Sequence, residues 1–169
     1  FHKSDLNEMS AFLRLNTNAH LQLAHHYGNK MKKRGKGGIL LVSSTGAFSA
    51  IPYMASYVAS KAFILSLGES LHIELKEHGV DVMVLAPGTT ETPGTMNAKN
   101  IDNSKLGVKF MSAGKVVEQT LKAFGKKVMF IPGGLNKFSF FLGKRVLSRL
   151  AMAKFLGGIM KKAISREVI

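Results

Sequence analysis

Apolar side chains follow two different spacings along the chain, one typical of helices and one typical of buried strands. From about residue 5 to residue 33 they recur every three or four positions, and Ser4 or Asp5 is placed to cap the first turn. The glycine-rich stretch 35–38 ends this helix, whose basic last turn suits the negative end of the helix dipole. Residues 39–42 are apolar throughout, which predicts a strand covered on both faces of a parallel sheet.

The same alternation continues through the first 135 residues. Strands that alternate with helices indicate a parallel α/β sheet with right-handed crossovers. In such sheets ligands bind beyond the carboxyl ends of the strands. The further expected elements are a helix over 53–76, a strand over 80–86 ended by Pro87 and Gly88, a loop to residue 111, a helix over 112–124 and a strand over 128–131.

Composition limits the class of protein. A chain of 169 residues, 46% of them hydrophobic, is long enough for one domain with a core. It contains no cysteine, which excludes thiol catalysis, a disulfide scaffold and cysteine-ligated zinc. That composition fits the cytoplasm. No apolar run is long enough to span a bilayer, so we expect at most a peripheral association with a membrane.

The formal net charge of +14 raises a second class of function. Lysine and arginine concentrate in two places, residues 30–36 and the segment from residue 126 to the end, which holds ten basic residues and one acidic residue. A basic α/β module without catalysis could bind an anionic membrane surface or nucleic acid. Few aromatic residues and no recognisable nucleic-acid motif weaken the nucleic-acid version, and we expect no such partner.

Three features that carry chemistry gather at one edge of the predicted sheet. Ser44 follows the first strand, Tyr57 and Lys61 open the next helix, and Pro87 with Gly88 ends the second strand. The four-residue spacing puts the Tyr57 and Lys61 side chains on one helix face, a turn apart. A neighbouring ammonium favours the phenolate form of a tyrosine, which makes it a better proton-transfer group. Taken alone, the pair could also be an ordinary pair of helix residues.

Two stretches carry a resemblance to a known family. They are GGILLVSSTGAFSAIPYMASYVASKAF and, further on, VDVMVLAPGTTETPG. Both closely resemble the catalytic half of the short-chain dehydrogenase/reductases, Rossmann-fold enzymes that move hydride between NAD or NADP and a carbonyl or alcohol.

The spacing within that family matches this chain at four places. Its serine, thirteen residues before the tyrosine of Y-x-x-x-K, is Ser44, and its asparagine, about twenty-eight residues earlier, is Asn16. Its P-G-x-x-x-T motif is met by Pro87, Gly88 and Thr92.

The resemblance implies a role for each matching residue. Tyr57 would transfer the proton, and Ser44 would hydrogen-bond the substrate oxygen. Lys61 would act on Tyr57 and hold the ribose hydroxyls of the cofactor. Asn16 would hold a water in the proton relay, and Thr92 would contact the nicotinamide carboxamide. The implied catalytic set is Asn16, Ser44, Tyr57 and Lys61, and the implied cofactor-binding set is Tyr57, Lys61, Pro87, Gly88 and Thr92.

Some positions keep alternatives open. Asn16 could face solvent, and Asn18 competes with it for the family role. Glu69 and His72 have the spacing of half a metal site, but no second copy of this motif occurs, so we expect no metal. The helices around Asn16 and after Tyr57 are the ones that the family commonly uses to form dimers, which implies a homodimer or homotetramer.

The glycine-rich turn that a dinucleotide enzyme places after its first strand is missing. RGKGGIL precedes a strand instead of following one. Only fifteen residues precede Asn16, where the family has roughly a hundred. We therefore expect the last three strands of a doubly wound sheet, an exposed edge at strand 39–42, and a fragment that is inactive alone.

The tail permits two interpretations. Residues 1–135 are expected to form the catalytic portion, and residues 136–169 a basic and apolar helical extension. This extension could lie on an anionic membrane. On one continuous helix, however, its basic side chains do not share a face, which favours short helices that cover the substrate end of the sheet. The basic residues concerned are Lys144, Arg145, Arg149 and Lys154, and the expected breaks are at Gly143 and Gly157–Gly158.

Overall fold

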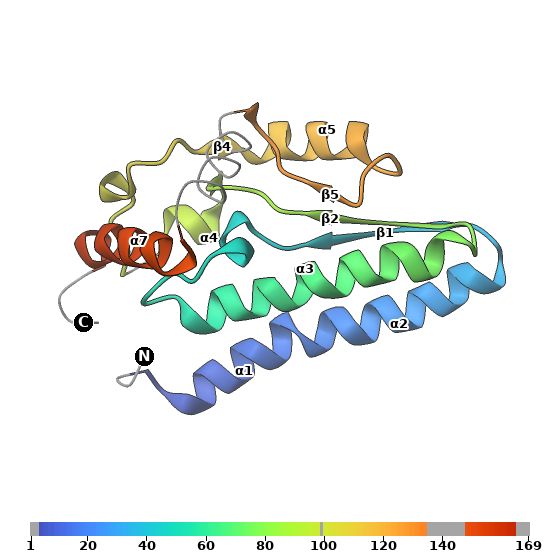
Figure 1. Cartoon of the computed structure of the whole chain (residues 1–169), viewed down its shortest axis with the longest axis horizontal. Helices are drawn as coiled ribbons and strands as arrows, with labels where there is room; N and C mark the ends of the chain where they lie inside the picture. The colour runs from blue at the N-terminus through green and yellow to red at the C-terminus, as the bar shows by residue number, and fades with distance from the viewer. Residues whose placement is uncertain (1–3, 99, 135–147, 165–169) are drawn as a thin grey trace.

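Three parallel strands form the centre of the molecule (Figure 1). The computed structural model describes residues 4–98, 100–134 and 148–164. The strand order is β1-β2-β5, and β1 pairs with β2 in register over its whole length, from Gly37 opposite Val80 to Val42 opposite Leu85. The predicted parallel α/β sheet is therefore confirmed. The strands are β1 (Gly37–Val42), β2 (Val80–Leu85) and β5 (Met129–Phe130).

Helices cover both faces of this sheet. Figure 1 shows α2 and α3 on one face and α5 on the other. Leu41 and Val82 pack with Ile64 of α3 beneath the sheet, whereas Met83 and Phe130 pack with α5 above it. The two clusters explain why β2, which lies in the middle, is apolar on both faces. The helices are α2 (Asn18–Lys33), α3 (Ala55–Lys76) and α5 (Ala113–Ala123).

Helix α3 approaches the sheet very closely at Gly68. A Cβ atom at this position would overlap the side chain of Val84 and lie 3.1 Å from that of Leu41. Glycine is therefore required here for packing and not for backbone conformation. The close approach fixes the distance of α3 from β1 and β2, and with it the position of the side chains in its first two turns.

The first predicted helix, over residues 5–33, is divided in two. Helix α1 (Leu6–Asn16) begins at Asp5, whose carboxylate accepts a hydrogen bond from the main-chain nitrogen of Glu8. At its end the side chains of Asn16 and Thr17 both donate to main-chain carbonyls one turn back. Such local side-chain bonds compete with regular helix geometry. Thr17 departs from it, with φ at −110°, and α2 follows.

The segment between β2 and α5, predicted as a loop, contains short elements. Thr90 and Met111 pair in a small two-stranded parallel sheet. Single turns of helix lie between those strands. The elements are β3 (Thr90–Glu91), α4 (Pro93–Met96), η2 (Asn103–Leu106) and β4 (Met111–Ser112).

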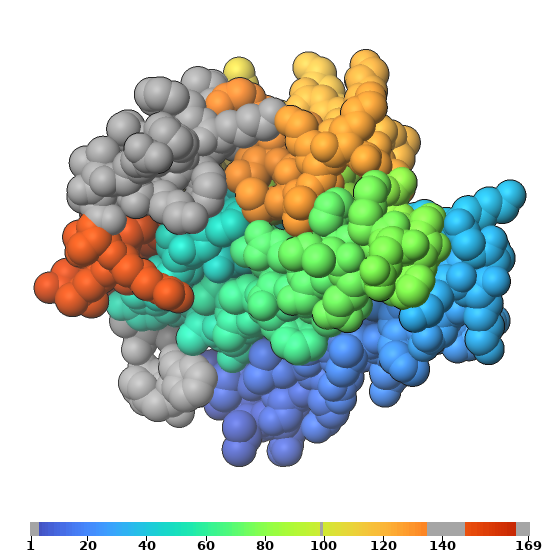
Figure 2. Space-filling view, turned by 45° about the vertical axis from the view of Figure 1, so that its right-hand side comes forward, coloured from blue at the N-terminus to red at the C-terminus, as the bar shows by residue number. Residues whose placement is uncertain are grey.

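Helix α7 (Arg149–Ala163) is the described part of the tail. It runs through Gly157 and Gly158 without interruption, so the break expected there is wrong; residues 135–147 and 165–169, including Gly143, lie outside the described residues. The main-chain nitrogen of Asp102 donates to the carbonyl of Ala163 at 2.8 Å, which ties α7 to the segment before η2. Figure 2 shows α7 beside the segment that joins β1 to α3.

Strand β1 lies at the end of the described strand order. Among the described strands it pairs only with β2. Leu40 and Val42 keep 37% and 43% of their surface exposed, because α5 covers β2 and β5 but does not reach over β1. The exposed edge agrees with the expectation from the sequence. The prediction that this strand is covered on both faces is wrong for the face that carries Leu40 and Val42. No described helix combines the length and apolar character needed to cross a bilayer.

Candidate active site

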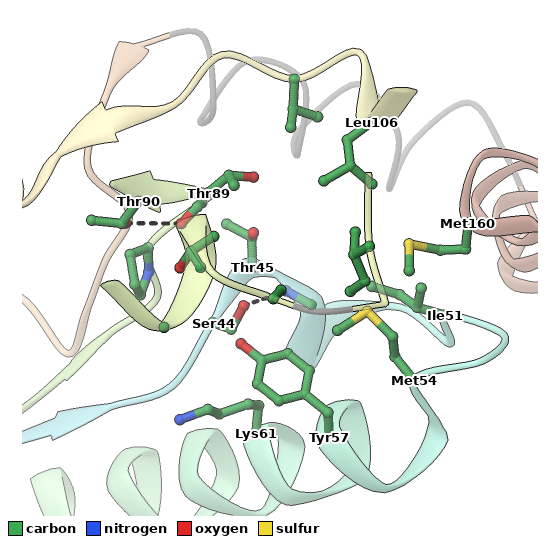
Figure 3. A pocket seen from close by; sticks show the side chains of 18 of the residues that line it. Ser44, Thr45, Ile51, Met54, Tyr57, Lys61, Thr89, Thr90, Leu106 and Met160 are labelled. Atoms are coloured by element: carbon green, nitrogen blue, oxygen red, sulfur yellow. Dashed lines mark hydrogen bonds between the residues drawn. The ribbon is translucent and has the colours of Figure 1, made fainter. Parts of the chain in front are cut away.

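A pocket of about 660 Å³ opens at the carboxyl ends of β1 and β2 (Figure 3). Its lining comes from the turns after β1 and β2, the end of α1, the first two turns of α3, the segment from α4 to η2 and beyond, and α7. This is the position that the topology of a parallel sheet predicts for a ligand. Of the residues singled out in the sequence, six line the pocket: Asn16, Ser44, Tyr57, Lys61, Pro87 and Gly88.

The two serines after β1 have different surroundings. Ser43 is buried, and its hydroxyl donates to the main-chain carbonyl of Lys61 at 2.7 Å. Ser44 precedes η1 (Thr45–Phe48), and its Oγ accepts a hydrogen bond from the main-chain nitrogen of Gly46 at 3.1 Å. Because Ser44 Oγ is the acceptor in that bond, its own hydrogen remains available for a ligand.

Tyr57 and Lys61 lie on the same side of α3. Figure 3 shows the Tyr57 hydroxyl directed toward Ser44, with Lys61 one turn further along the helix. Lys61 Nζ is 5.9 Å from the centre of the Tyr57 ring and donates to the main-chain carbonyl of Val42 at 3.1 Å. Burial lowers the pKa of Lys61, because a half-buried ammonium loses part of its hydration. The hydrogen bond to the Val42 carbonyl offsets part of that loss.

The Asn16 side chain is engaged within its own helix. It donates to the carbonyl of Phe12 at 3.0 Å, at the point where α1 ends and α2 begins. His20 stands one turn further along the chain, and no sequence motif pointed to it. Burial and the charge of Lys61 lower the pKa of His20, and the main-chain carbonyl of Asn16 opposes this. The four-residue spacing between Asn16 and His20 is the sequence feature from which His20 could have been found.

The turn after β2 supplies main-chain and hydroxyl groups. The Pro87 carbonyl accepts a hydrogen bond from the Thr45 nitrogen at 2.9 Å, which joins the two strand ends. Thr92 caps α4, and its hydroxyl is 2.8 Å from that of Thr95. Thr95 lines the pocket and Thr92 does not, so the role expected for Thr92 stays a prediction. Thr89 and Thr90 also line the pocket and were not anticipated.

Apolar side chains form the wall opposite Lys61. Met54 and Ile51 contribute from the loop before α3, and Met160 contributes from α7 (Figure 3). Sequence reasoning missed this wall, because its members lie far apart in the chain and have ordinary hydrophobic spacing. The remaining apolar lining residues are Phe12, Ala98, Ile101, Leu106, Val108, Leu156 and Ile159.

Metal ligation has no support in the described part of the chain. No group of three or more histidine or carboxylate side chains is placed to hold an ion there. His72 Nδ1 lies 2.6 Å from the main-chain carbonyl of Val82, so the Glu69 and His72 motif belongs to helix–strand packing.

Comparison with known proteins explains this arrangement. The profile of the short chain dehydrogenase family matches residues 1–103, well over half of the chain. The chain belongs to the short-chain dehydrogenase family. The matched residues include Asn16, Ser44, Tyr57 and Lys61 together with the Pro87 turn.

Curated members of this family include proteins that are similar to this chain. A 7beta-hydroxysteroid dehydrogenase from Clostridium sardiniense is 28% identical over 137 residues, which are 81% of this chain and 52% of that protein. One from Collinsella aerofaciens is 32% identical over 133 residues, which are 76% of this chain and 50% of that protein. The chain thus spans about half the length of these relatives.

Solved short-chain dehydrogenase structures show the same fold. The structure of a 7beta-hydroxysteroid dehydrogenase, from work on its stereoselectivity, superposes with a TM-score of 0.81 at 26% identity, over 93% of this chain and 61% of that one. A short-chain dehydrogenase from Sphingobium yanoikuyae in complex with NADPH gives a TM-score of 0.71 at 24% identity, over 88% of this chain and 60% of that one. The second likeness shows the fold alone.

Proposed function

We propose that this chain carries the proton-transfer half of an NAD(P)-dependent oxidoreductase that interconverts a carbonyl and an alcohol. The supporting observation is that Ser44, Tyr57 and Lys61 line one pocket at the carboxyl ends of the strands of a short-chain dehydrogenase fold. The proposal concerns the whole protein, because the chain spans only about half the length of its relatives.

The residues of the pocket fit a nicotinamide dinucleotide. Lys61 offers a half-buried cation, and the turn at Pro87 and Gly88 offers main-chain groups at the strand end. Lys61 would hold the ribose hydroxyls, and Thr92 the carboxamide, with Tyr57, Pro87 and Gly88 completing the contacts. When bound, the nicotinamide supplies or accepts the hydride, so the protein has to supply or accept the proton. A short-chain dehydrogenase with the same fold binds NADPH, which makes NADP a reasonable cofactor. We leave NAD and NADP both open.

The proton chemistry falls to this chain's own side chains. Ser44 donates its free hydrogen to the substrate oxygen and holds it beside the Tyr57 hydroxyl. Tyr57 gives its proton to that oxygen during reduction and takes it back during oxidation. The Lys61 ammonium stabilises the phenolate that Tyr57 becomes in between. Asn16 lines the same pocket and would hold a water that connects this group to solvent.

The substrate that fits this pocket is bulky and largely apolar. The walls of the pocket are methionine, leucine, isoleucine and valine side chains, while the polar groups of the pocket cluster around Ser44 and Tyr57. Sites of several hundred cubic ångströms with few polar groups suit molecules of drug or steroid size. The 7beta-hydroxysteroid dehydrogenases among the relatives act on such molecules, which supports a ring-bearing alcohol or ketone as the substrate class.

The direct test of this function is the substitution Tyr57→Phe in the protein as its source organism makes it. It removes one oxygen and should lower the rate of NAD(P)H oxidation on a steroid ketone by about 10²–10⁴-fold. Tyr53→Phe is the matched control, because Tyr53 is exposed and does not line the pocket. Equal rates in the two variants, or no hydride transfer in the wild type with either cofactor, would refute the proposal.

We also propose a second copy of the protein as partner. Helices α1 and α2 leave large apolar side chains exposed, and the family resemblance assigns dimer formation to the helices around Asn16 together with α3. The exposed side chains of α1 and α2 are Leu6, Phe12, Leu15, Leu21, Leu23 and Tyr27. Sedimentation of wild type and Leu23→Lys tests this, with a shift toward monomer expected for the variant. The alternative of a basic module without catalysis rests on charge alone, and we do not propose it.

A further inference from the structure

His20 is a titratable side chain next to the proposed site that no step described so far uses. It stands in the first turn of α2, four residues after Asn16, and it does not line the pocket. Asn16 and Lys61 do line the pocket. His20 thus lies four residues along the chain from a residue of the pocket lining without belonging to the lining itself.

One nitrogen of the His20 imidazole is enclosed by protein and makes no hydrogen bond to a described residue. Its Nδ1 atom is shielded from solvent and has no hydrogen-bond partner among the described residues. An enclosed ring nitrogen without a hydrogen-bond partner lowers the stability of the folded protein. Such a nitrogen is therefore expected to bind a water or a ligand. The residue as a whole is only half-buried, so the ring spans the boundary between the interior and solvent.

The ring is also coupled electrostatically to the site. The ammonium of Lys61, from α3, is the charged group that acts on it, and it lowers the pKa of His20 together with burial. A main-chain hydrogen-bond interaction with Asn16 acts in the opposite direction and raises this pKa. The ring is therefore neutral at pH 7, with one nitrogen that donates and one that accepts.

We propose that His20 passes protons between solvent and Tyr57 by way of Lys61. This inference rests on the proposed function. In reduction, hydride adds to the carbonyl carbon while the nicotinamide is oxidised, the Tyr57 O–H bond breaks, and the new O–H bond of the alcohol forms. Tyr57 is then a phenolate and needs one proton. His20 takes that proton from solvent on one ring nitrogen and releases one from the other toward Lys61, which restores Tyr57. Oxidation runs the same transfers in reverse.

Neutral imidazole suits this task because it can accept a proton on one ring nitrogen while it donates a proton from the other. It returns to its starting form when the ring rotates or its tautomer changes back. His20 touches neither substrate nor cofactor. It is a positioning residue that acts through Lys61, so its loss should slow the proton step and leave substrate binding unchanged.

The kinetic test is His20→Gln in the protein as its source organism makes it, with His26→Gln as control. His26 is exposed on the same helix, with its ring edge against Tyr27. We expect kcat for reduction to fall on the order of tenfold in His20→Gln at neutral pH, with KM unchanged and a larger solvent deuterium isotope effect. His20→Ala should regain rate when imidazole is added. A kcat, pH profile and isotope effect equal to those of His26→Gln would overturn the proposal.

A second measurement does not depend on activity. An NMR titration of the His20 ring should give a higher pKa in Lys61→Met than in the wild type, because the charge that lowers it is gone. An unchanged titration would overturn the coupling to Lys61 and with it the proposal. Absence of hydride transfer in the wild type would overturn the proposed function and the role of His20 together. Wild-type activity with an unaffected His20→Gln would overturn the role of His20 alone.

Discussion

The hydroxyl of Ser43 donates a 2.7 Å hydrogen bond to the main-chain carbonyl of Lys61. This bond joins the end of β1 to the second turn of α3, and the serine that makes it is 2% exposed. Its neighbour Ser44 directs its oxygen into the pocket instead. Two adjacent serines thus have separable duties, one in holding the helix against the strand and one at the site.

These duties predict opposite outcomes for two single substitutions. Ser43→Ala leaves the buried Ser43 site without its hydroxyl donor and should lower the free energy of unfolding by about 1–2 kcal/mol. Ser44→Ala should change that free energy by less than about 0.5 kcal/mol, since the residue is half-buried at a turn. It should nevertheless lower kcat/KM by about 10²-fold. Urea unfolding and steady-state kinetics on both variants check this, and a stability loss confined to Ser44→Ala would contradict it.

Helix α7 offers a matched pair of glycines. A Cβ at Gly157 would lie 2.8 Å from Cγ of Pro52, whereas one at Gly158 would meet nothing within 4 Å. Replacing a helix glycine by alanine normally stabilises by about 0.5–1 kcal/mol, and we expect this for Gly158→Ala.

In Gly157→Ala the contact with Pro52 should cancel that gain and displace α7, which carries Leu156 and Met160 of the pocket wall. The KM for an apolar ketone should rise in this variant alone. Thermal unfolding and KM measured on both variants decide the matter, and equal behaviour would show that α7 does not depend on Pro52.

The close approach of α3 to the sheet should be sensitive to one methyl group. Gly68→Ala forces a side chain into Val84 and should lower the free energy of unfolding by about 1–3 kcal/mol. Gly114→Ala, in the first turn of α5 with open space around it, serves as control and should be neutral or slightly stabilising. Chemical denaturation of the two variants is the measurement. A loss of similar size in both would point to a helix effect instead of packing.

The pKa of His20 predicts a pH dependence of stability with a definite sign. Burial and Lys61 hold this pKa below its ordinary value of 6.5, so the unfolded chain binds the proton more readily than the folded one. The contribution of His20 is complete above about pH 6.5 and is lost as pH falls through the folded-state pKa. His20→Gln should therefore flatten the decline in unfolding free energy between about pH 7 and pH 5. Urea unfolding across that range measures it, and parallel curves would contradict the expectation.

Much of the fold was predictable because each expected strand is short, mostly apolar and close to a glycine or proline. The strand starting near Val80 and its end at Pro87 follow from this pattern directly. The division at Thr17 was not predictable from periodicity, because the apolar spacing continues across it. The bonds of Asn16 and Thr17 to carbonyls one turn back compete with the helix locally, and composition does not reveal which of them form.

The site was predictable where spacing along one element or at strand ends fixes position. Ser44, Tyr57 and Lys61 meet because a strand end and the start of the following helix meet. The continuous helix through Gly157 and Gly158 was mispredicted, since helix propensity ranks glycine low but the contact with Pro52 favours a residue without a side chain. The pocket wall around Met54 and Met160 depends on contacts between distant segments, for which a single sequence gives no register.

Strands β1 and β2 pair in register and are connected through α3, and this connection affects how the site forms during folding. Ser44, Tyr57, Lys61 and Pro87 all belong to this single crossover or the turn after it. Bringing them together requires the closure of only one loop, and the entropy lost in closing a loop grows slowly with its length. A polypeptide leaving the ribosome could therefore assemble the proposed proton-transfer groups as soon as β2 emerges, before α7, which completes the pocket wall, has been synthesised.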